Sequence, residues 1–514
     1  MNKLKYILSI VFITILLGTV NQSCTNLDEE LYSELDGKTF FDDPDNLIYA
    51  FGTAYTNLYW TIGHKYALGR DCGTDILVVP QRGGDWFDGG EWHRYHRLTW
   101  TPSDFYVEFW WNLMYKGINT CNSLIFQFEA VGTEEADIAI AELRAFRALY
   151  YYWLIDVYGN VPIVTKFDVP ADFAPATNTR KEVYDFIESE IMEVKDLLSK
   201  DTGLATYGRV NYYVAQMILA KLYINAEVFT GTPQWDKAEA ALDEIINSGK
   251  YQLASDYFDN FQLEGQLSPE IIMGVPFDEI NAQGLEIHLF SLHYNLQEKY
   301  GMQQLPWNGL CVQESFFNSF EEQDIRRTGL LFGKQYDKSG NQIEDPGWEK
   351  FDPTNPTAPR DLDGAGLNLT PEINQLEPNC LRQAGARIYK WKFPENTDRY
   401  LSNDFPIFRY ADVLLMKAEV QLRNGGGNAD TYVNMVRERA GVEDLTGVTL
   451  DQLLEERGRE LFVEGFRRND LIRFGKYLDA RWEKEDVSPD YVKLWPIPAA
   501  QINSNANLIQ NPGY

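Results

Sequence analysis

The sequence is poor in the residues that most often carry chemistry. Histidine and cysteine occur only five times each among 514 residues. The chain contains no HExxH zinc motif, no GxSxG nucleophile elbow, no Walker phosphate loop and no usable GxGxxG. Aspartate and glutamate are plentiful, but no spacing singles out one pair as the acid and base of a glycosidase. The sequence therefore favours a binding protein over an enzyme.

Positive charge is also scarce. Lysine and arginine together number 46 against 76 aspartates and glutamates, which gives a formal net charge of −30. Nucleic-acid binding needs a basic footprint, and electrostatic docking on anionic lipid needs one too, so both are disfavoured. The balance suits a soluble body that binds neutral or cationic ligands.

The residues that bind metals are few and badly spaced. His93 and His96 stand three apart with no third ligand, which is a weak zinc pattern. The run Asp361-x-Asp363-Gly364 resembles the start of a calcium loop but lacks the later acidic ligand. We therefore expect no metal and no cofactor.

The first 23 residues have the pattern of an export signal. Lys3 and Lys5 precede an apolar stretch, residues 6–20, that is too short for a membrane span of about 20 residues. Cys24 follows, as in a lipoprotein cleavage site, and acylation there would anchor the chain to a membrane. The alternative is ordinary cleavage, with Cys24 an incidental thiol.

The other four cysteines leave the disulfide question open. Cys72, Cys121, Cys311 and Cys380 allow three pairings, and their spacing is not that of a metal site. The remaining possibility is that all four are free, buried thiols.

Aromatic residues, by contrast, are abundant, with 13 Trp and 30 Tyr. Trp86 lies in a tryptophan-rich stretch, between the glycine pairs 83–84 and 89–90, which is typical of a loop. A sugar ring binds with its apolar face on an aromatic ring and its hydroxyls on acidic or guanidinium partners. We therefore predict a ligand surface here, with a tryptophan-rich corner of the core as the alternative. Its candidate residues are Asp75, Arg82, Trp86, Trp92 and Trp100.

Helical periodicity dominates much of the remaining sequence. Apolar residues recurring at i, i+3, i+4 and i+7 predict a series of helices. They cover residues 45–59, a long helix from about 105, then 134–158, 179–200, 210–228, 235–248 and 429–440. Ala148 and Tyr151, and again Ala220 and Tyr223, have the spacing of a tetratricopeptide unit. Stacked helix pairs of this kind build a scaffold whose faces serve as docking surfaces.

The last hundred residues predict two further helices. An apolar stripe follows Phe405, and Pro406 suits the first turn of that helix. Thr449 and Gln452 form a capping box for a second, highly charged helix that continues through Asp470.

Ion pairs are expected along this charged helix. Glu455 and Arg459, and likewise Glu464 and Arg468, have the i,i+4 spacing that lets side chains pair on one face. Leucines and phenylalanines are interleaved with them, which indicates that some pairs are buried between helices.

Four runs of the sequence are similar to the SusD/RagB family of outer-membrane nutrient-binding lipoproteins. They are AELRAFRALYYYWLIDVYGNVPIV (141–164), RYADVLLMKAE (409–419), the ER, EL, EG, R and DLIR pattern of 456–473, and the terminal PIP and QNPGY. The resemblance implies a mostly α fold with degenerate tetratricopeptide repeats over about 40–255 and 405–480. Residues 256–404, punctuated by Pro, Gly, Asn and Asp, would be the loop-rich, ligand-facing part of one domain spanning 24–514.

The resemblance also implies a function. Such proteins capture a glycan or oligosaccharide and hand it to a SusC-like TonB-dependent porin of the outer membrane. The anchor would be a lipid on Cys24, with the protein facing the cell exterior. The family's platform draws aromatics from a second region, where Trp307 and Tyr294 are the candidates. A scaffold or peptide-binding lipoprotein without a glycan ligand, and a glycoside hydrolase, are the alternatives.

Overall fold

The computed structural model describes residues 44–62, 69–263, 265–345 and 366–514. Residues 47–514 group into one compact unit. Cys24 and the run from Asp361 to Gly364 lie outside the described residues. Within the described ranges, no helix combines the length and the apolar character that crossing a bilayer requires.

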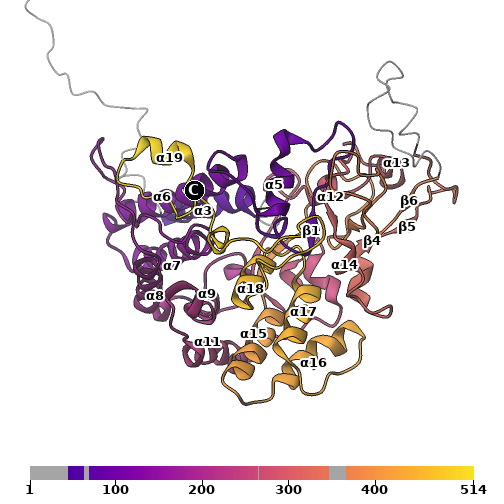
Figure 1. Ribbon diagram of the computed structural model, residues 1–514. Helices are drawn as coiled ribbons and strands as arrows, with labels where there is room; N and C mark the ends of the chain where they lie inside the picture. Colours follow the sequence, from indigo (N-terminus) through magenta and orange to yellow (C-terminus); the bar gives the residue numbers. More distant parts are fainter. Residues whose placement is uncertain (1–43, 63–68, 264, 346–365) are drawn as a thin grey trace, which may run out of the picture. The chain divides into compact units, whose positions relative to one another are not determined.

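Packed α-helices make up the first half of this unit (Figure 1). They are α3 (Pro44–Thr61), α5 (Glu91–Arg97), α6 (Phe105–Glu129), α7 (Glu134–Val157), α8 (Arg180–Val194), α9 (Tyr212–Ile224), α10 (Ala226–Thr230) and α11 (Trp235–Ser248). α6 packs on α7, α7 on α8 and α9 on α11, so successive helices form stacked pairs. The expected mostly α fold is confirmed.

The residues of the predicted repeat lie in the core of these helices. Ala148 and Ala220 are fully buried, and Tyr151 and Tyr223 are at most 5% exposed. Small alanines let paired helices approach closely, while the tyrosine rings fill the space beside them. Arg147 is buried in the same bundle and pairs with a glutamate of α8.

The C-terminal part is again helical, but its first helix starts later than expected. Its helices are α15 (Tyr410–Arg423), α16 (Ala429–Ala440), α17 (Leu450–Leu461), α18 (Arg467–Arg473) and α19 (Ala499–Ser504). The capping box of Thr449 and Gln452 is confirmed at α17. A helix start at Pro406 is wrong, because Phe405–Arg409 form strand β8, antiparallel to β2 (Ile271–Val275). Pro406 stands opposite Gly274 beside a register shift, where a missing N–H is tolerated.

The charged helix also ends earlier than expected. α17 stops at Leu461, and Val463 takes a left-handed φ of 64° before α18 begins. Valine adopts this conformation only when its surroundings impose it, so the packing around the segment fixes the break. Glu464 lies in the break, its spacing from Arg468 is no longer helical, and the expected pair gives way to a contact with Arg409 at 2.8 Å.

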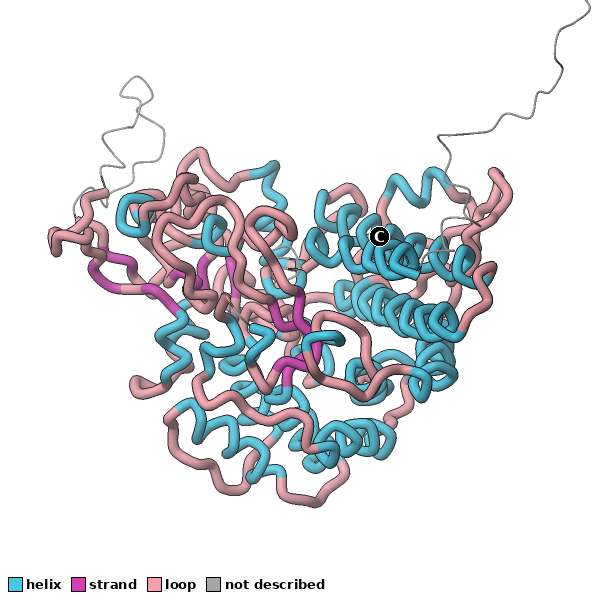
Figure 2. Tube along the Cα trace, turned by 180° about the vertical axis from the view of Figure 1, so that it is seen from behind, coloured by secondary structure: helices cyan, strands magenta, loops and turns pink. Residues whose placement is uncertain are grey.

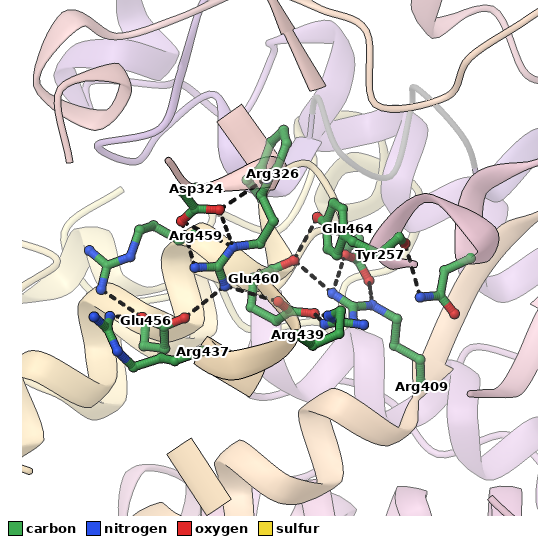
Figure 3. A network of polar contacts seen from close by, with 12 residues as sticks. Tyr257, Asp324, Arg326, Arg409, Arg437, Arg439, Glu456, Arg459, Glu460 and Glu464 are labelled. Carbon is green, nitrogen blue, oxygen red and sulfur yellow. Dashed lines mark hydrogen bonds and ion pairs between the residues drawn. The ribbon is translucent and has the colours of Figure 1, made fainter. Parts of the chain in front are cut away.

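Ion pairs of this region form a buried network, drawn in part in Figure 3. It comprises Glu270, Asp324, Arg326, Lys390, Arg409, Arg437, Arg439, Glu456, Arg459, Glu460 and Glu464. Arg409 lies at its centre, fully buried, with carboxylate oxygens of Glu270, Glu460 and Glu464 within 2.8 Å. The network ties α17 to β2, β8 and α16, as expected of pairs buried between elements.

Acid should weaken this network. Burial alone would raise the pKa of Glu456, but Arg326 and Arg459 lower it from 4.5 to about 2. A folded-state pKa below the unfolded one stabilises the fold fully above the unfolded pKa and loses that effect as the pH falls towards 2. We expect the urea midpoint to fall between about pH 5 and pH 3, and to fall less steeply in Glu456→Gln. Equal slopes in the two proteins would contradict this assignment.

Outside the long helices the described residues form only short elements, most of them within 256–404, as the sequence predicts. They are α12 (Ile287–Ser291), α13 (Leu296–Tyr300), α14 (Glu314–Phe317), and the strand pairs β1 (Leu77–Val78) with β3 (Cys311–Val312), β4 (Leu330–Leu331) with β7 (Arg387–Ile388), and β5 (Gly333–Lys334) with β6 (Asn368–Leu369). Figure 2 shows most strands and loops on one side of this unit and the long helices on the other. The four described cysteines are free and buried.

Candidate functional site

Strands β1 and β3 bring together two segments that lie far apart in the sequence. They pair antiparallel, with Leu77 opposite Val312 and Val78 opposite Cys311. A third segment holds the chain that leaves β1, since the amide of Gln81 donates to the carbonyl of Leu376 at 2.9 Å. Loop 82–92 is thereby placed beside the segment that precedes β3, and Figure 1 shows α5, β1 and α12 as neighbours.

Four partly exposed aromatic rings gather at this junction: Trp86, Phe290, Tyr294 and Trp307, here called the aromatic cluster. The ring centroids of Trp86 and Phe290 are 5.6 Å apart, and those of Phe290 and Trp307 are 4.7 Å apart at 78°. Trp86 Nε1 donates to the carbonyl of Trp307 at 2.7 Å. The hydroxyl of Tyr294 donates to Asp85, directly before Trp86. Three predicted residues, Trp86, Tyr294 and Trp307, are thus brought together.

Trp86 is held in a strained conformation. Its φ of 64° is left-handed, which a bulky residue adopts only under constraint. The indole lies against Gly309, where an added Cβ would stand 2.3 Å from ring atom Cε2. Together with the Nε1 hydrogen bond, this packing fixes the main chain around Trp307. Trp86 therefore acts mainly as a clamp that positions Trp307.

Two arginines flank the cluster, and each is paired with a carboxylate. The guanidinium groups are partly exposed and keep donors for hydroxyl groups, whereas their carboxylate partners are buried. The cluster is therefore apolar at its centre and has a polar rim whose opposite charges offset one another. Arg382 lies 4.7 Å from the Tyr294 ring centroid and pairs with Asp345 at 3.2 Å. Arg399 lies 5.9 Å from the Trp307 ring centroid and pairs with Glu286.

Three predicted ligand residues are buried, which corrects the expectation that they line a surface. Arg82, Trp92 and Trp100 are 4%, 6% and 4% exposed. The partners of Arg82 and Trp100 come from distant parts of the chain, which the sequence alone could not reveal, whereas Trp92 packs among neighbours of its own stretch. Arg82 donates to the Ala384 carbonyl (2.8 Å), Trp92 meets the Trp86 ring edge-on (6.0 Å), and Trp100 donates to the Tyr514 hydroxyl (2.6 Å). These side chains support the cluster.

Asp75, the remaining candidate of this stretch, is engaged elsewhere. Its two oxygens accept from Arg467 of α18 at 2.8 and 2.7 Å. Burial alone would raise the pKa of Asp75, but Arg467 and Arg481 lower it. Asp75 lines a cavity of about 560 Å³ together with Ser315 and Phe316, none of which belongs to the cluster.

The two neighbouring histidines also have protein partners. His93 Nδ1 lies 2.7 Å from Glu377, and His96 Nε2 lies 2.7 Å from the carbonyl of Trp482. Burial lowers the pKa of His96 to about 3, so it is neutral. Within the described ranges, no three His, Cys, Asp or Glu side chains come together as metal ligands.

Sequence reasoning missed Phe290, Arg382 and Arg399. Phe290 lies in α12, which ends at Ser291 before an extended Leu292, so no helical spacing links it to Tyr294 and no local pattern marked it. The two arginines lie in loops without periodicity, and nothing in the sequence marked them.

The fold and the site define a class: a helical-repeat frame that carries an irregular surface with exposed aromatic rings. Sequence comparison then gives the family. The model of the "SusD family" matches residues 383–514, and one described as "Starch-binding associating with outer membrane" matches 81–224. The starch-binding protein SusD of Bacteroides thetaiotaomicron is 26% identical over 454 residues, covering 81% of this chain and 80% of that protein. SusD-like protein P25 of Formosa agariphila is 26% identical over 441 residues, covering 79% of each. Together these matches support a SusD-like family member.

Solved structures share the fold. Surface glycan-binding protein A from Bacteroides thetaiotaomicron superposes with a TM-score of 0.72 at 24% identity, covering 91% of this chain and 98% of that one. The same protein in complex with laminarihexaose gives 0.72 at 23% identity, covering 91% and 99%. A SusD superfamily protein from Parabacteroides distasonis gives 0.73 at 22% identity, covering 92% and 99%.

Proposed function

We propose that this protein binds a glycan or its oligosaccharides at the cell surface through the aromatic cluster. The observation that carries the proposal is the cluster itself: partly exposed rings of Trp307 and Tyr294, held by Trp86 and Asp85 and rimmed by paired charges. A sugar lays its apolar face on such rings while its hydroxyls bond to the rim. The relatives named as starch-binding and surface glycan-binding proteins, one of them bound to laminarihexaose, support it.

The proposal extends to delivery and anchoring. The captured glycan passes to a SusC-like TonB-dependent transporter of the outer membrane, and residues 24–514 act as one domain. A lipid on Cys24 holds the protein on the exterior of that membrane. The family description "associating with outer membrane" and the SusD relatives support this part of the proposal.

Binding occurs without cleavage in this proposal. The carboxylates around the cluster are engaged by protein groups: Asp85 by Tyr294, and Glu286 and Asp345 by arginines. Hydrolysis needs one carboxyl group to donate a proton and another to act as base or nucleophile across the scissile bond. The relatives described as binding proteins also support capture over hydrolysis.

Affinity electrophoresis tests the proposal. The full mature chain should migrate more slowly in gels that contain soluble starch or laminarin than in gels without glycan, relative to a non-binding reference protein. An assay for new reducing ends on the same glycans should stay at background. Unretarded migration on both, and on a wider set of neutral glycans, would contradict glycan capture and leave a scaffold or peptide-binding role.

Trp86→Phe tests the clamp. The substitution keeps an apolar ring but removes the Nε1 hydrogen bond to the Trp307 carbonyl, which contributes about 1 kcal/mol. We expect glycan affinity in calorimetry to fall about fivefold to tenfold, which corresponds to about 1–1.4 kcal/mol. The matched control is Trp92→Phe, whose Nε1 donates to Asp88 at 2.7 Å and does not bond Trp307. Similar losses in both variants would show that positioning of Trp307 is not the cause.

A further inference from the structure

A second hollow lies where β3 runs into α14. It has a volume of about 240 Å³ and is lined by Gln313, Glu314, Ser315, Asn318, Ile373 and Trp482. Through Ser315 it adjoins the cavity of about 560 Å³ that Asp75 lines. Cavities of roughly 300–1,000 Å³ are the size that small organic ligands occupy, so the two together offer room for a sugar unit and its neighbours.

Trp482 gives this hollow a rigid aromatic wall. Its side chain packs against a buried cluster that includes Val78, Cys311 and Ile373, directly behind the β1–β3 pair. The ring meets His96 edge-on, with centroids 5.5 Å apart at 68°, and the Trp482 carbonyl lies 2.7 Å from His96 Nε2. The indole is only partly buried and lines the cavity, so a fixed aromatic surface faces it.

Three polar side chains beside this indole have no side-chain partner among the described residues. Glu314, Ser315 and Asn318 are exposed, and their side chains make no hydrogen bond or ion pair with any described residue. In the adjoining cavity, by contrast, charged side chains already pair with protein groups. Arg467, for example, lies 2.7 Å from Asp75. A carboxylate, a hydroxyl and an amide therefore remain available beside one aromatic ring.

We infer that Trp482, with Glu314, Ser315 and Asn318, forms a second carbohydrate subsite, which rests on the glycan-binding function proposed above. The indole takes the apolar face of a sugar ring, and the three side chains take its hydroxyls, both as donors and as acceptors. An uncharged sugar fits best, because Glu314 forms no ion pair with a described residue and its carboxylate would repel an anionic sugar. This subsite is separate from the aromatic cluster and shares no residue with it.

One glycan chain can reach both places. Trp307 and Ser315 are eight residues apart, so their backbones are separated by at most about 29 Å of extended chain. A polysaccharide held at the cluster meets the second subsite at a high effective concentration, and dissociation then requires both contacts to open. An oligosaccharide of three units occupies one site at a time and gains nothing from the other.

The test compares long and short ligands on Trp482→Ala, with Asn318→Ala as a second variant whose exposed position spares the fold. The probes are soluble starch with maltotriose and laminarin with laminaritriose, measured by affinity electrophoresis and calorimetry on the full mature chain. The matched control is Trp235→Ala, a half-buried tryptophan of α11 away from both sites. Melting curves accompany each variant.

We expect Trp482→Ala to weaken polysaccharide binding by at least about fivefold and Asn318→Ala by about twofold, with trisaccharide affinity at the cluster unchanged. The calorimetric stoichiometry for trisaccharide should fall from two sites to one in Trp482→Ala. Polysaccharide affinity equal to that of the wild type in both variants would overturn the second subsite alone. A wild-type protein that binds none of the four probes and none of the wider set of neutral glycans would instead overturn the proposed function.

Discussion

Replacing Arg409 by methionine should destabilise the folded protein by about 3–5 kcal/mol, the cost of leaving buried charge without its partner. Arg409 is fully buried and holds Glu270, Glu460 and Glu464 through its three guanidinium nitrogens. Methionine fills much of the same volume but donates no hydrogen bond, so the three buried carboxylates lose their shared cation and keep only Arg326, Lys390 and Arg439 as partners. The loss should be measured as a shift of the urea unfolding midpoint at neutral pH.

An exposed pair provides the control. Lys181 and Asp185 lie 2.6 Å apart on the surface of α8, at i,i+4. Water and salt screen such pairs, so Lys181→Met should leave the midpoint almost where it is. If Arg409→Met behaved like Lys181→Met, the network in Figure 3 would be dispensable for stability, and its role in fixing α17 against β8 would have to be abandoned.

Replacing Trp307 by alanine should cost glycan affinity at least about tenfold, or about 1.4 kcal/mol, with little change in melting temperature. The Trp307 side chain is partly exposed, and its main-chain carbonyl, which Trp86 Nε1 holds, is untouched by the substitution. What disappears is the ring that meets Phe290 and that, in the proposed function, contacts the apolar face of the ligand. Calorimetry on the glycan that retards the wild type measures the loss.

Trp235→Ala separates this effect from a general loss of aromatic surface. Trp235 of α11 is likewise half-buried and lies 4.9 Å from the Arg423 guanidinium, far along the chain from the cluster. It should bind glycan as the wild type does. A Trp307→Ala protein with full affinity would remove the aromatic cluster as the ligand site, and a large drop in its melting temperature would show that the ring is part of the core.

The helical frame could be predicted because its signals are local. Apolar periodicity located α7 and α16, and the capping box of Thr449 and Gln452 located the start of α17 to the residue. Glu455 and Arg459 pair at 3.8 Å as their i,i+4 spacing predicts, because they stay on one helix. Each of these features depends on residues within one or two turns of one another.

What could not be predicted depends on partners far away in the chain. Pro406 was read as a helix start, but β2, more than a hundred residues earlier, draws its segment into a strand. Glu464 and Arg468 were separated by a break that tertiary packing imposes at Val463. Trp86, Trp92 and Trp100 were all candidates for the ligand surface, and the contact of Trp100 with Tyr514, more than four hundred residues later, could not be predicted.

The bond between Asp75 and Arg467 has a consequence for biogenesis. It joins positions almost four hundred residues apart, and the nearby contact of Arg70 Nε with the Gly465 carbonyl, at 2.7 Å, spans a similar distance. Neither can close until nearly the whole polypeptide has been synthesised. A chain that ended before Gly465 would leave the Asp75 carboxylate without Arg467 and Arg70 without this carbonyl. The complete fold therefore cannot form before the C-terminal part of the chain is present.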